Sequence, residues 1–418
     1  VSVLYWILGS QMSGPIAGGT PSYTAAVEAV VPTAKAARAA IWRHTYEVFR
    51  TGQYRPEDGG GTPDGVLPAS IVPESLAISL FRPGTHFGAP PQPPKTAPIR
   101  VLVQDIDCLV AAERLASAGM PPLVMDAGSR RHFGGGYQNG SRAQEEELCR
   151  RTSLALQCDC SQGWQTTHLY PLPPAAAIHV PRVQVIRHGA DRQYRLMSKP
   201  FECGVGIVAA YNKPKLDATG RAIVGQAAKD TREMLRSFFG AAATNGYKSV
   251  VCIAVGCGAF CNPAGHVAQL FAEVLKLPEV RGSCIEEAVF AVLDDHNAFH
   301  RFNPDGNFLA FARTLAREAS ATVRSRDGTD VTQQVLNGGS GDGAPVTSAG
   351  SATLVSPPQP HAAHAGADMQ HAEADTTEAK RKKKTRLQSG ATKPRKPALV
   401  VDDDNAADDV IDVDAESD

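Results

Sequence analysis

The chain of 418 residues lacks the features that mark several large classes of protein. It has no run of 18 apolar residues, so a membrane-spanning helix is not expected. Its nine cysteines are odd in number, form no CxxC pair and stop at Cys284. This pattern favours reduced thiols in a cytosolic or nuclear protein over a disulfide framework. Zinc sites need ligands in paired short spacings, which are also missing, so no metal is expected.

Aromatic residues and charges of one sign are missing from long stretches of the chain. No aromatic residue follows Phe311. Residues 1–326 carry 33 basic and 27 acidic side chains, whereas residues 327–378 carry seven acidic side chains and no Lys or Arg. Nine basic residues lie within 380–396, and nine acidic residues lie within 402–418. The formal net charge of −1 is therefore the sum of unlike blocks.

These blocks divide the chain into three parts. Residues 25–326 contain enough apolar side chains for one folded domain. Residues 327–418 are dominated by small and polar residues, which bury too little surface to offset the entropy of ordering, so we expect a disordered tail. Residues 1–24 are left undetermined, because the opening VSVLYWIL has neither an initiator Met nor the basic residues that precede a signal-peptide core.

Apolar segments of strand length alternate with segments of helical periodicity, which predicts an α/β sandwich. Thr33 is the expected N-cap of the first helix, Gly52 its C-terminal stop, and Pro181 is expected to push its strand to a sheet edge. The expected strands are 101–103, 122–125, 178–186, 205–210, 249–255 and 285–293, and the expected helices are 33–50, 107–119, 143–156, 217–240, 264–276 and 307–320.

Two glycine-rich segments follow apolar strands. The first contains Gly134, Gly135 and Gly136, and the second contains Gly256, Cys257, Gly258, Ala259 and Phe260. A glycine loop between a strand and a helix can turn its backbone N–H groups inward and form a concave site for phosphates. A tight turn is the alternative interpretation of each loop, and the loops alone do not decide between them.

Three acidic residues, Glu145, Glu146 and Glu147, open the helix after the first loop. Glutamates are common at helix N-termini because they complement the helix dipole. Beside two candidate phosphate loops, two adjacent glutamates can instead have different catalytic roles. One can orient a hydroxyl, and the other can hold a proton for a leaving oxygen. Cleavage of a glycosidic bond requires a carboxyl group of this kind.

The spacing of these motifs resembles that of microbial-type poly(ADP-ribose) glycohydrolases. Seven residues separate the GGG motif from Gln144-Glu145-Glu146, and the second loop reads GCGAFCNP. Further similar segments follow in the family's order and extend the resemblance over about 35–320. They are 38–54, 178–188, 207–212, 255–271 and 289–295.

The resemblance implies a three-layer α/β/α macrodomain-like sandwich with a mixed central sheet that binds ADP-ribose. It implies that Glu146 is the catalytic acid at a ribose–ribose bond and that Glu145 holds a ribose hydroxyl. Gln144 and the two glycine loops would contact the substrate, with the loops around the diphosphate and Phe260 against the ADP-ribose. No cofactor is implied, and a monomer is expected. The resemblance also associates the chain with the DNA damage response.

The chain departs from the family's pattern at a few positions. Asp126 stands where the family's strand ends in Asn, Phe133 replaces a Pro before the GGG motif, and Ala259 replaces a common Val. An ionised carboxylate accepts hydrogen bonds but cannot donate them. The sequence therefore does not decide whether Asp126 makes the ribose contact expected of the family's Asn. A weakly active ADP-ribose reader and a hydrolase of single ADP-ribosyl units are therefore alternatives. The motifs do not distinguish cleavage within the polymer (endo) from cleavage at its end (exo).

Two motifs in the tail suggest location and partners. The basic run Lys380, Arg381, Lys382, Lys383 and Lys384 is typical of a nuclear-import signal bound by importin, with non-specific nucleic-acid binding as the alternative. The apolar residues Val410, Ile411 and Val413, set among acids, resemble a SUMO-interacting motif. Shielding of the basic block by the acidic end is the alternative for that segment. We therefore expect a nuclear protein, with a cytoplasmic pool left open.

Overall fold

The structure is a computed structural model that describes residues 35–56, 65–66, 78–84, 87, 97–158, 169–295 and 297–337. The expected segment 1–24, the cap Thr33, the basic block and the acidic end with its apolar residues lie outside these ranges. Within them, no helix is long and apolar enough to cross a membrane.

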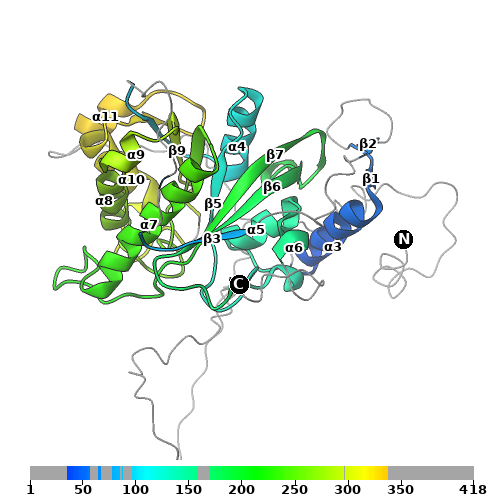
Figure 1. Ribbon diagram of the computed structural model, residues 1–418, viewed down its shortest axis with the longest axis horizontal. Coiled ribbons are helices and arrows are strands. Elements are labelled where there is room, and N and C mark those ends of the chain that lie inside the picture. Colours follow the sequence, from blue (N-terminus) through cyan, green and yellow to red (C-terminus); the bar gives the residue numbers. More distant parts are fainter. Residues whose placement is uncertain are drawn as a thin grey trace, which may run out of the picture. The chain divides into compact units, whose positions relative to one another are not determined.

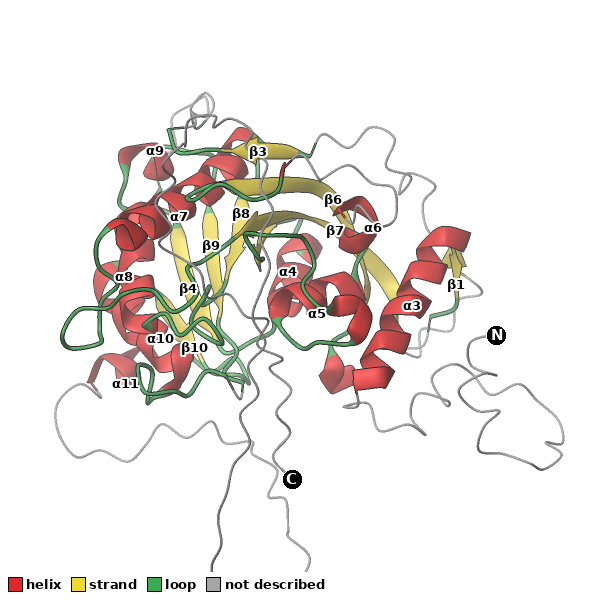
Figure 2. Cartoon of the chain, turned by 90° about the horizontal axis from the view of Figure 1, so that it is seen from below, coloured by secondary structure: helices red, strands yellow, loops and turns green. Residues whose placement is uncertain are grey.

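The centre of the domain is a mixed sheet of eight strands (Figures 1 and 2). Six neighbouring strands pair in parallel, and the last two pairings at one side are antiparallel. In sheet order the strands are β10 (Thr322–Arg324), β4 (Arg100–Gln104), β9 (Glu287–Ala291), β8 (Ser249–Cys252), β5 (Leu123–Ala127), β7 (Leu196–Val208), β6 (Ala177–Arg187) and β3 (Ser79–Phe81). A separate antiparallel pair joins β1 (Gln53–Tyr54) and β2 (Gly65–Val66).

Helices cover both faces of the sheet, which confirms the expected three layers (Figure 2). Every residue of β8 is buried, as an apolar strand between two helical layers requires. One face carries α7 (Gln226–Thr244), α8 (Ala264–Leu275) and α10 (Gly306–Glu318), against which α9 (Pro278–Arg281) and α11 (Thr332–Asn337) pack. The other face carries α4 (Cys108–Ser117) and α5 (Gln144–Arg151), with α6 (Leu154–Cys158) and α3 (Lys35–Thr51) beside α5. Two short 3-10 helices are η2 (Tyr137–Asn139) and η5 (Ala190–Arg192).

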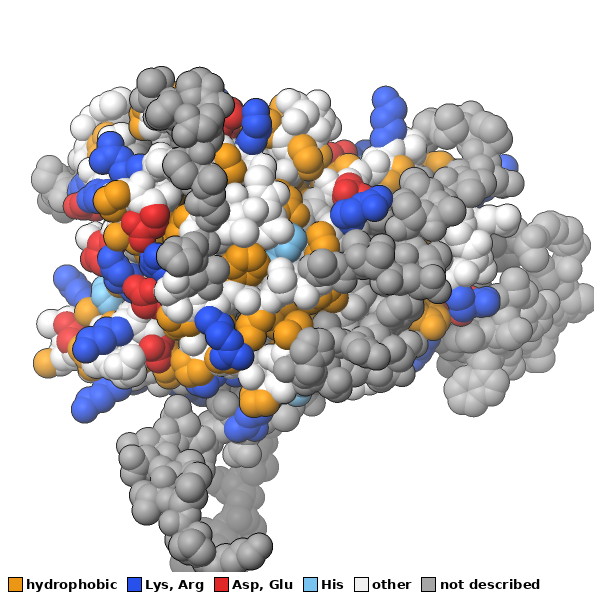
Figure 3. Space-filling view, in the orientation of Figure 1, with side chains coloured by type: hydrophobic (Ala, Val, Ile, Leu, Met, Phe, Trp, Pro, Cys, Tyr) orange, Lys and Arg blue, Asp and Glu red, His pale blue; other side chains and the backbone are white. Residues whose placement is uncertain are grey.

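The outer surface over α8 and α10 carries charges of both signs (Figure 3). Figure 3 shows Lys and Arg side chains intermixed with Asp and Glu at the left of that view. One such pair joins Lys276 to Glu318 at 2.8 Å, with both side chains about half exposed. This face is therefore typical of a solvated surface rather than of a binding patch for a polyanion.

The expectation that β6 lies at a sheet edge is wrong, because β3 pairs with its first residues. Pro181 instead sits where the pairing of β6 with β7 shifts register, between Val180 and Val183. A bulge leaves a residue out of the ladder, so the missing N–H of the proline costs no hydrogen bond there. Arg182 takes up the bend with a φ of +55°.

Two expected helices have different bounds. The helix expected over 143–156 is divided at Thr152, whose hydroxyl accepts a hydrogen bond from the N–H of Leu154, the first residue of α6, at 3.0 Å. The helix expected from residue 217 begins at Gln226. Asp217 instead closes a turn by accepting the N–H groups of Arg221 and Ala222. Both differences arise because short polar side chains compete with helical hydrogen bonds.

The boundary expected at residue 326 falls too early, because the described domain continues to Asn337. The segment folds back so that the Thr332 hydroxyl accepts the Val323 N–H at 2.8 Å. The following helix, α11, buries Val335 against the core. A single buried valine in a polar helix is too weak a pattern to mark this element in the sequence.

Candidate active site

The two glycine loops lie at the same edge of the sheet. The first follows β5 and the second follows β8, and these strands are adjacent and parallel. The carboxyl ends of parallel strands meet at one edge, and ligands of open α/β sheets bind there. Strands β4 and β9 end at the same edge and contribute further loops.

The first loop lies directly on the start of α5. Gly134 and Gly135 have φ values of +85° and +54°, in the region that favours glycine. The Gly136 N–H donates to Glu146 Oε1 at 3.0 Å. A Cβ on Gly135 would collide with that same oxygen. Glycine at this position is therefore what allows the loop to approach the Glu146 carboxyl so closely.

Gln144 fastens α5 to the end of β5. Its Oε1 accepts the Ala127 N–H at 2.8 Å, and its Nε2 donates to the Met125 carbonyl at 3.0 Å. Sequence analysis assigned Gln144 to substrate binding. In the structure its amide bonds the strand backbone on both sides and also lines a cavity, so Gln144 fixes the register of α5 against β5 and thereby positions the glutamates that follow.

The second loop is held from behind by Asn262. The Asn262 amide donates to the carbonyls of Tyr211 and Gly256 at 2.8 and 2.9 Å. Gly256 has a φ of +74°, and a Cβ there would lie 2.5 Å from the Ala210 Cβ. His300 contacts the Cys257 carbonyl at 2.9 Å. These bonds occupy backbone carbonyls and give the loop one conformation.

A cavity of about 280 Å³ separates the two sides of the site. The second loop contributes Gly256, Gly258, Ala259 and Phe260 to its wall, whereas the Cys257 side chain is buried. The opposite wall includes Gly128, Ala143 and Gln144. The structure thus brings the second loop and the start of α5 together around one space.

The predicted catalytic pair does not line that cavity. Glu145 and Glu146 are buried, with exposed fractions of 4 % and 6 %, and Asp126 is fully buried beside them. Four carboxyl oxygens of this cluster have no hydrogen-bond partner: both of Asp126, Oε1 of Glu145 and Oε2 of Glu146. The three groups form a carboxyl cluster beneath the first loop. In the described part of the chain, no group of three His, Cys, Asp or Glu residues is arranged to hold a metal ion.

Two members of the carboxyl cluster, Asp126 and Glu145, have raised pKa values. Burial raises the pKa of Asp126 well above its ordinary value, and the neighbouring Glu146 raises it further. Burial and then Asp126 raise the pKa of Glu145, partly offset by a hydrogen bond from the Gly134 backbone. Desolvation and like charges act in the same direction here, since both disfavour a second negative charge.

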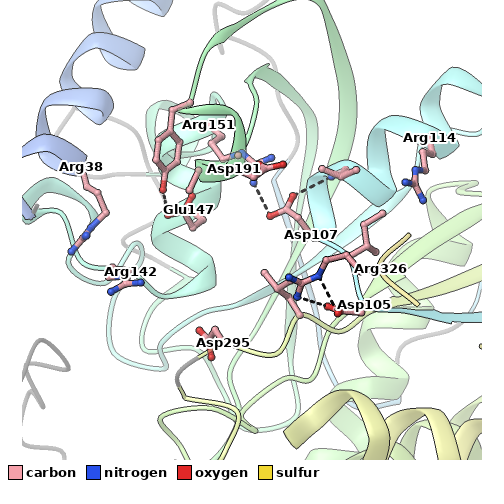
Figure 4. A pocket seen from close by; sticks show the side chains of 16 residues that line it. Arg38, Asp105, Asp107, Arg114, Arg142, Glu147, Arg151, Asp191, Asp295 and Arg326 are labelled. Carbon is pink, nitrogen blue, oxygen red and sulfur yellow. Dashed lines mark hydrogen bonds and ion pairs between the residues drawn. The ribbon is translucent and has the colours of Figure 1, made fainter. Parts of the chain in front are cut away.

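A second, charged cavity of about 520 Å³ adjoins the first (Figure 4). The buried Arg151 guanidinium lies 2.8 Å from Asp107, and Arg326 contacts Asp105 at 3.1 Å. Burial alone would raise the pKa of Asp107, but Arg151 and two backbone N–H groups hold it below its usual value. The charged side chains on the wall are Arg38, Asp105, Asp107, Arg114, Arg142, Glu147, Arg151, Asp191, Asp295 and Arg326.

Sequence analysis missed the residues after β4. Ile106 and Asp107 line both cavities, and Asp107 also caps α4 by accepting the N–H groups of Leu109 and Val110. The available signal was an Asp between an apolar strand and a helix, which is ordinary for an N-cap. Its pairing with Arg151 connects segments 44 residues apart and is not visible in either one.

Comparisons with known proteins agree with this geometry. Residues 43–188 match the family model of the microbial-type PARG catalytic domain. Two crystal structures of poly(ADP-ribose) glycohydrolase from Thermomonospora curvata are similar to this chain. The one bound to the inhibitor ADP-HPD is 26% identical, and the alignment covers 66% of this chain and 99% of that chain with a TM-score of 0.53. The other is 27% identical over 67% and 99%, also with a TM-score of 0.53. No curated protein matches the sequence.

The fold and the site together define an α/β/α domain of the macrodomain type, with two glycine loops and an acidic helix start at the carboxyl edge of its sheet. The match over residues 43–188 and the similarity to the T. curvata structures agree with the resemblance to microbial-type poly(ADP-ribose) glycohydrolases seen in the sequence.

The carboxyl cluster predicts an unusual pH dependence of stability for Asp126→Asn. Above about pH 4 an unfolded Asp ionises, whereas the buried Asp126 keeps its proton, so the stability of the wild type falls as pH rises. The neutral Asn lacks this penalty. We expect its unfolding temperature at pH 7 to exceed that of the wild type by about 3 °C or more, with a smaller difference at pH 4.

Thermal unfolding at several pH values checks this expectation. Asp217→Asn is the control, because a hydrogen bond from the Thr219 side chain lowers the pKa of that exposed carboxyl. It should give no gain at pH 7. A gain for Asp126→Asn that does not grow with pH would contradict the account.

Proposed function

We propose that this domain hydrolyses the ribose–ribose O-glycosidic bonds of poly(ADP-ribose) and releases ADP-ribose. The observation that carries the proposal is the pair Glu145 and Glu146, buried in the first turn of α5 beneath a glycine loop. The pair lies within the residues that match the family model. The similar structures from T. curvata are poly(ADP-ribose) glycohydrolases, one of them with an inhibitor bound.

In the proposed reaction Glu146 is the general acid. Its carboxyl donates a proton to the leaving ribose oxygen as the bond to the anomeric carbon breaks, which produces an oxocarbenium-like state. Water then attacks that carbon and returns a proton to the carboxylate. Glu145 holds a hydroxyl of the terminal ribose. Because the first loop covers both carboxyls, access requires that loop to shift, and consecutive glycines permit such a change.

The second glycine loop lines the cavity, so its backbone N–H groups are proposed ligands of the diphosphate, because clustered N–H groups attract anions. The first loop is on the wall of neither cavity, and its part in binding the diphosphate is proposed from the resemblance alone. Cys257 can contribute only its backbone, since its thiol points away and donates to the Val255 carbonyl at 3.6 Å. Phe260 lines the cavity and is half-buried, so its ring is available to pack against the ligand.

Glu146→Gln tests the role of the acid. The amide keeps the size of the side chain but cannot supply the proton, so polymer hydrolysis should fall by about 100-fold or more. ADP-ribose binding, measured by calorimetry, should remain. Glu318→Gln, at the exposed end of α10, serves as the control and should hydrolyse like the wild type. A fully active Glu146→Gln variant would remove Glu146 from the mechanism.

Gly135→Ala tests the close approach of the first loop. The added methyl group collides with Glu146 at a positive φ, so we expect hydrolysis to drop by at least about ten-fold. Gly119→Ala is a matched control: its φ is +79°, and a Cβ there meets nothing within 4 Å. It imposes the same kind of backbone strain without touching a carboxyl group. Equal activity of the two variants would show that strain alone explains the loss.

We also propose nuclear import through Lys380–Lys384 and a SUMO contact through the apolar residues near 410–413, with a role in the DNA damage response. The support is the composition of these segments, which lie outside the described residues. A fluorescent fusion of the full chain should be nuclear, and replacing the five basic residues with Ala should make it cytoplasmic. Unchanged nuclear signal in that variant would refute the import signal. A tail peptide that causes no chemical-shift changes in SUMO would refute the other contact.

A further inference from the structure

The first glycine loop lies between two backbone anchors. On one side the Leu172 N–H donates to the Arg130 carbonyl at 2.8 Å, and on the other the Arg38 guanidinium donates to the Gly140 carbonyl at 2.5 Å. A Cβ on Gly140 would collide with the backbone of α3, so this end of the loop is pressed against that helix. We therefore expect any shift of the loop that exposes the glutamates to occur within residues 131–139.

Tyr137 attaches this segment to the rest of the domain. Within residues 131–139, all of which the structure describes, Tyr137 is the only residue with a buried side chain. Its ring lies so close to Gly134 that a Cβ there would be 2.7 Å from a ring carbon. The Tyr137 N–H also donates to the Gly134 carbonyl at 3.2 Å. The ring and the glycines are thus joined, and a shift of one requires a shift of the other.

The pocket that receives the Tyr137 ring is built by three helices. Trp42 of α3 meets the ring edge-on, with 5.0 Å between the ring centroids, and Cys149 of α5 and Ala155 of α6 complete the cluster. Edge-to-face packing of this kind is favourable for two aromatic rings. The buried residues of this cluster are separate from the main core, so the contact can loosen while the sheet stays packed.

Trp42 has an unpaired polar group in this arrangement. Its side chain is 9 % exposed, and its Nε1–H has no hydrogen-bond acceptor among the described residues. A buried indole N–H usually has a partner, and leaving it unpaired is unfavourable. The apolar contact with Tyr137 therefore stabilises the loop in this position while one polar group stays unsatisfied. A ligand that favours another position of the loop can shift this balance.

We propose that Tyr137 is a positioning residue whose ring, seated against Trp42, holds the first glycine loop over Glu145 and Glu146, and that ADP-ribose binding releases it. The inference rests on the proposed function, because the ligand is the ADP-ribose unit whose bond these glutamates cleave. The seated loop covers the carboxyls that the ligand must reach. The apparent affinity for ADP-ribose is therefore reduced to the extent that the loop is seated.

Tyr137→Leu tests this inference through binding, measured by calorimetry with ADP-ribose and the full chain. Leucine fills part of the pocket but loses the ring contacts with Trp42 and Gly134. We expect ADP-ribose to bind about three-fold more tightly or better, because more molecules have the loop released. Replacing a residue that only stabilised the fold would not improve binding. Unchanged or weaker binding would overturn the proposal.

Two further variants keep this test independent of folding. Trp42→Phe trims the same contact from the side of α3 and should also tighten binding, by a smaller factor. Tyr46→Leu is the matched control, since Tyr46 contacts Trp42 within α3 at 6.0 Å between ring centroids and is not part of the loop. It should bind ADP-ribose like the wild type. Equal gains for Tyr46→Leu and Tyr137→Leu would overturn the proposal, because general loosening of the cluster would then explain both.

The fluorescence of Trp42 reports the position of the loop directly. The chain has three tryptophans, and replacing Trp6 and Trp164 with Phe leaves Trp42 as the single one. Saturating ADP-ribose should move its emission to longer wavelength, because the pocket opens to water when the Tyr137 ring leaves. Unchanged emission at saturation would overturn the proposal.

The two measurements separate this inference from the proposed function. A change in emission without hydrolysis of poly(ADP-ribose) would refute the proposed function and leave the release of the loop standing. Hydrolysis without a change in emission would refute the release and leave the proposed function standing. Failure of ADP-ribose to bind the wild type would overturn both.

Discussion

The site depends on how closely a glycine backbone can approach the first turn of α5. A Cβ on Gly135 would collide with Glu146 Oε1, and the next residue donates its N–H to that oxygen. Gln144 fixes the other side of the contact by bonding the backbone of β5. Together these contacts bury two glutamates that would be exposed on an ordinary helix start, and burial changes their chemistry.

Carboxyl groups in this domain occupy two different environments. In the charged cavity Asp105 and Asp107 are each paired with an arginine, which fixes their positions, and the pairing with Arg151 helps to lower the pKa of Asp107. In the carboxyl cluster Asp126 and Glu145 have no such partner, and burial raises the pKa of both. The site thus has ion-paired carboxyl groups on its wall and buried carboxyl groups without a cation beneath its glycine loop, and such different environments suit the different roles of carboxyl groups in glycosidic cleavage.

The sequence predicted the layered α/β fold because each central strand is apolar over a short run and each helix shows its own periodicity. It also predicted both loops and the glutamate pair, since glycine triplets and an acidic run are local patterns. The bulge at Pro181, the continuation to α11 and the Asp107–Arg151 pair were not predictable in this way. Each depends on contacts between segments that are far apart in the sequence. The residues of one segment do not indicate which other segment they contact. The hydrogen bonds of Gln144 to β5 were not predictable for the same reason.

The most direct test of the central claim is to incubate the full chain with labelled poly(ADP-ribose) and follow free ADP-ribose. The account predicts that the polymer shortens and that ADP-ribose accumulates over many turnovers. Polymer that is bound but remains intact would contradict the account and identify a reader instead. Release from proteins carrying single ADP-ribosyl units, without any shortening of the polymer, would contradict it as well.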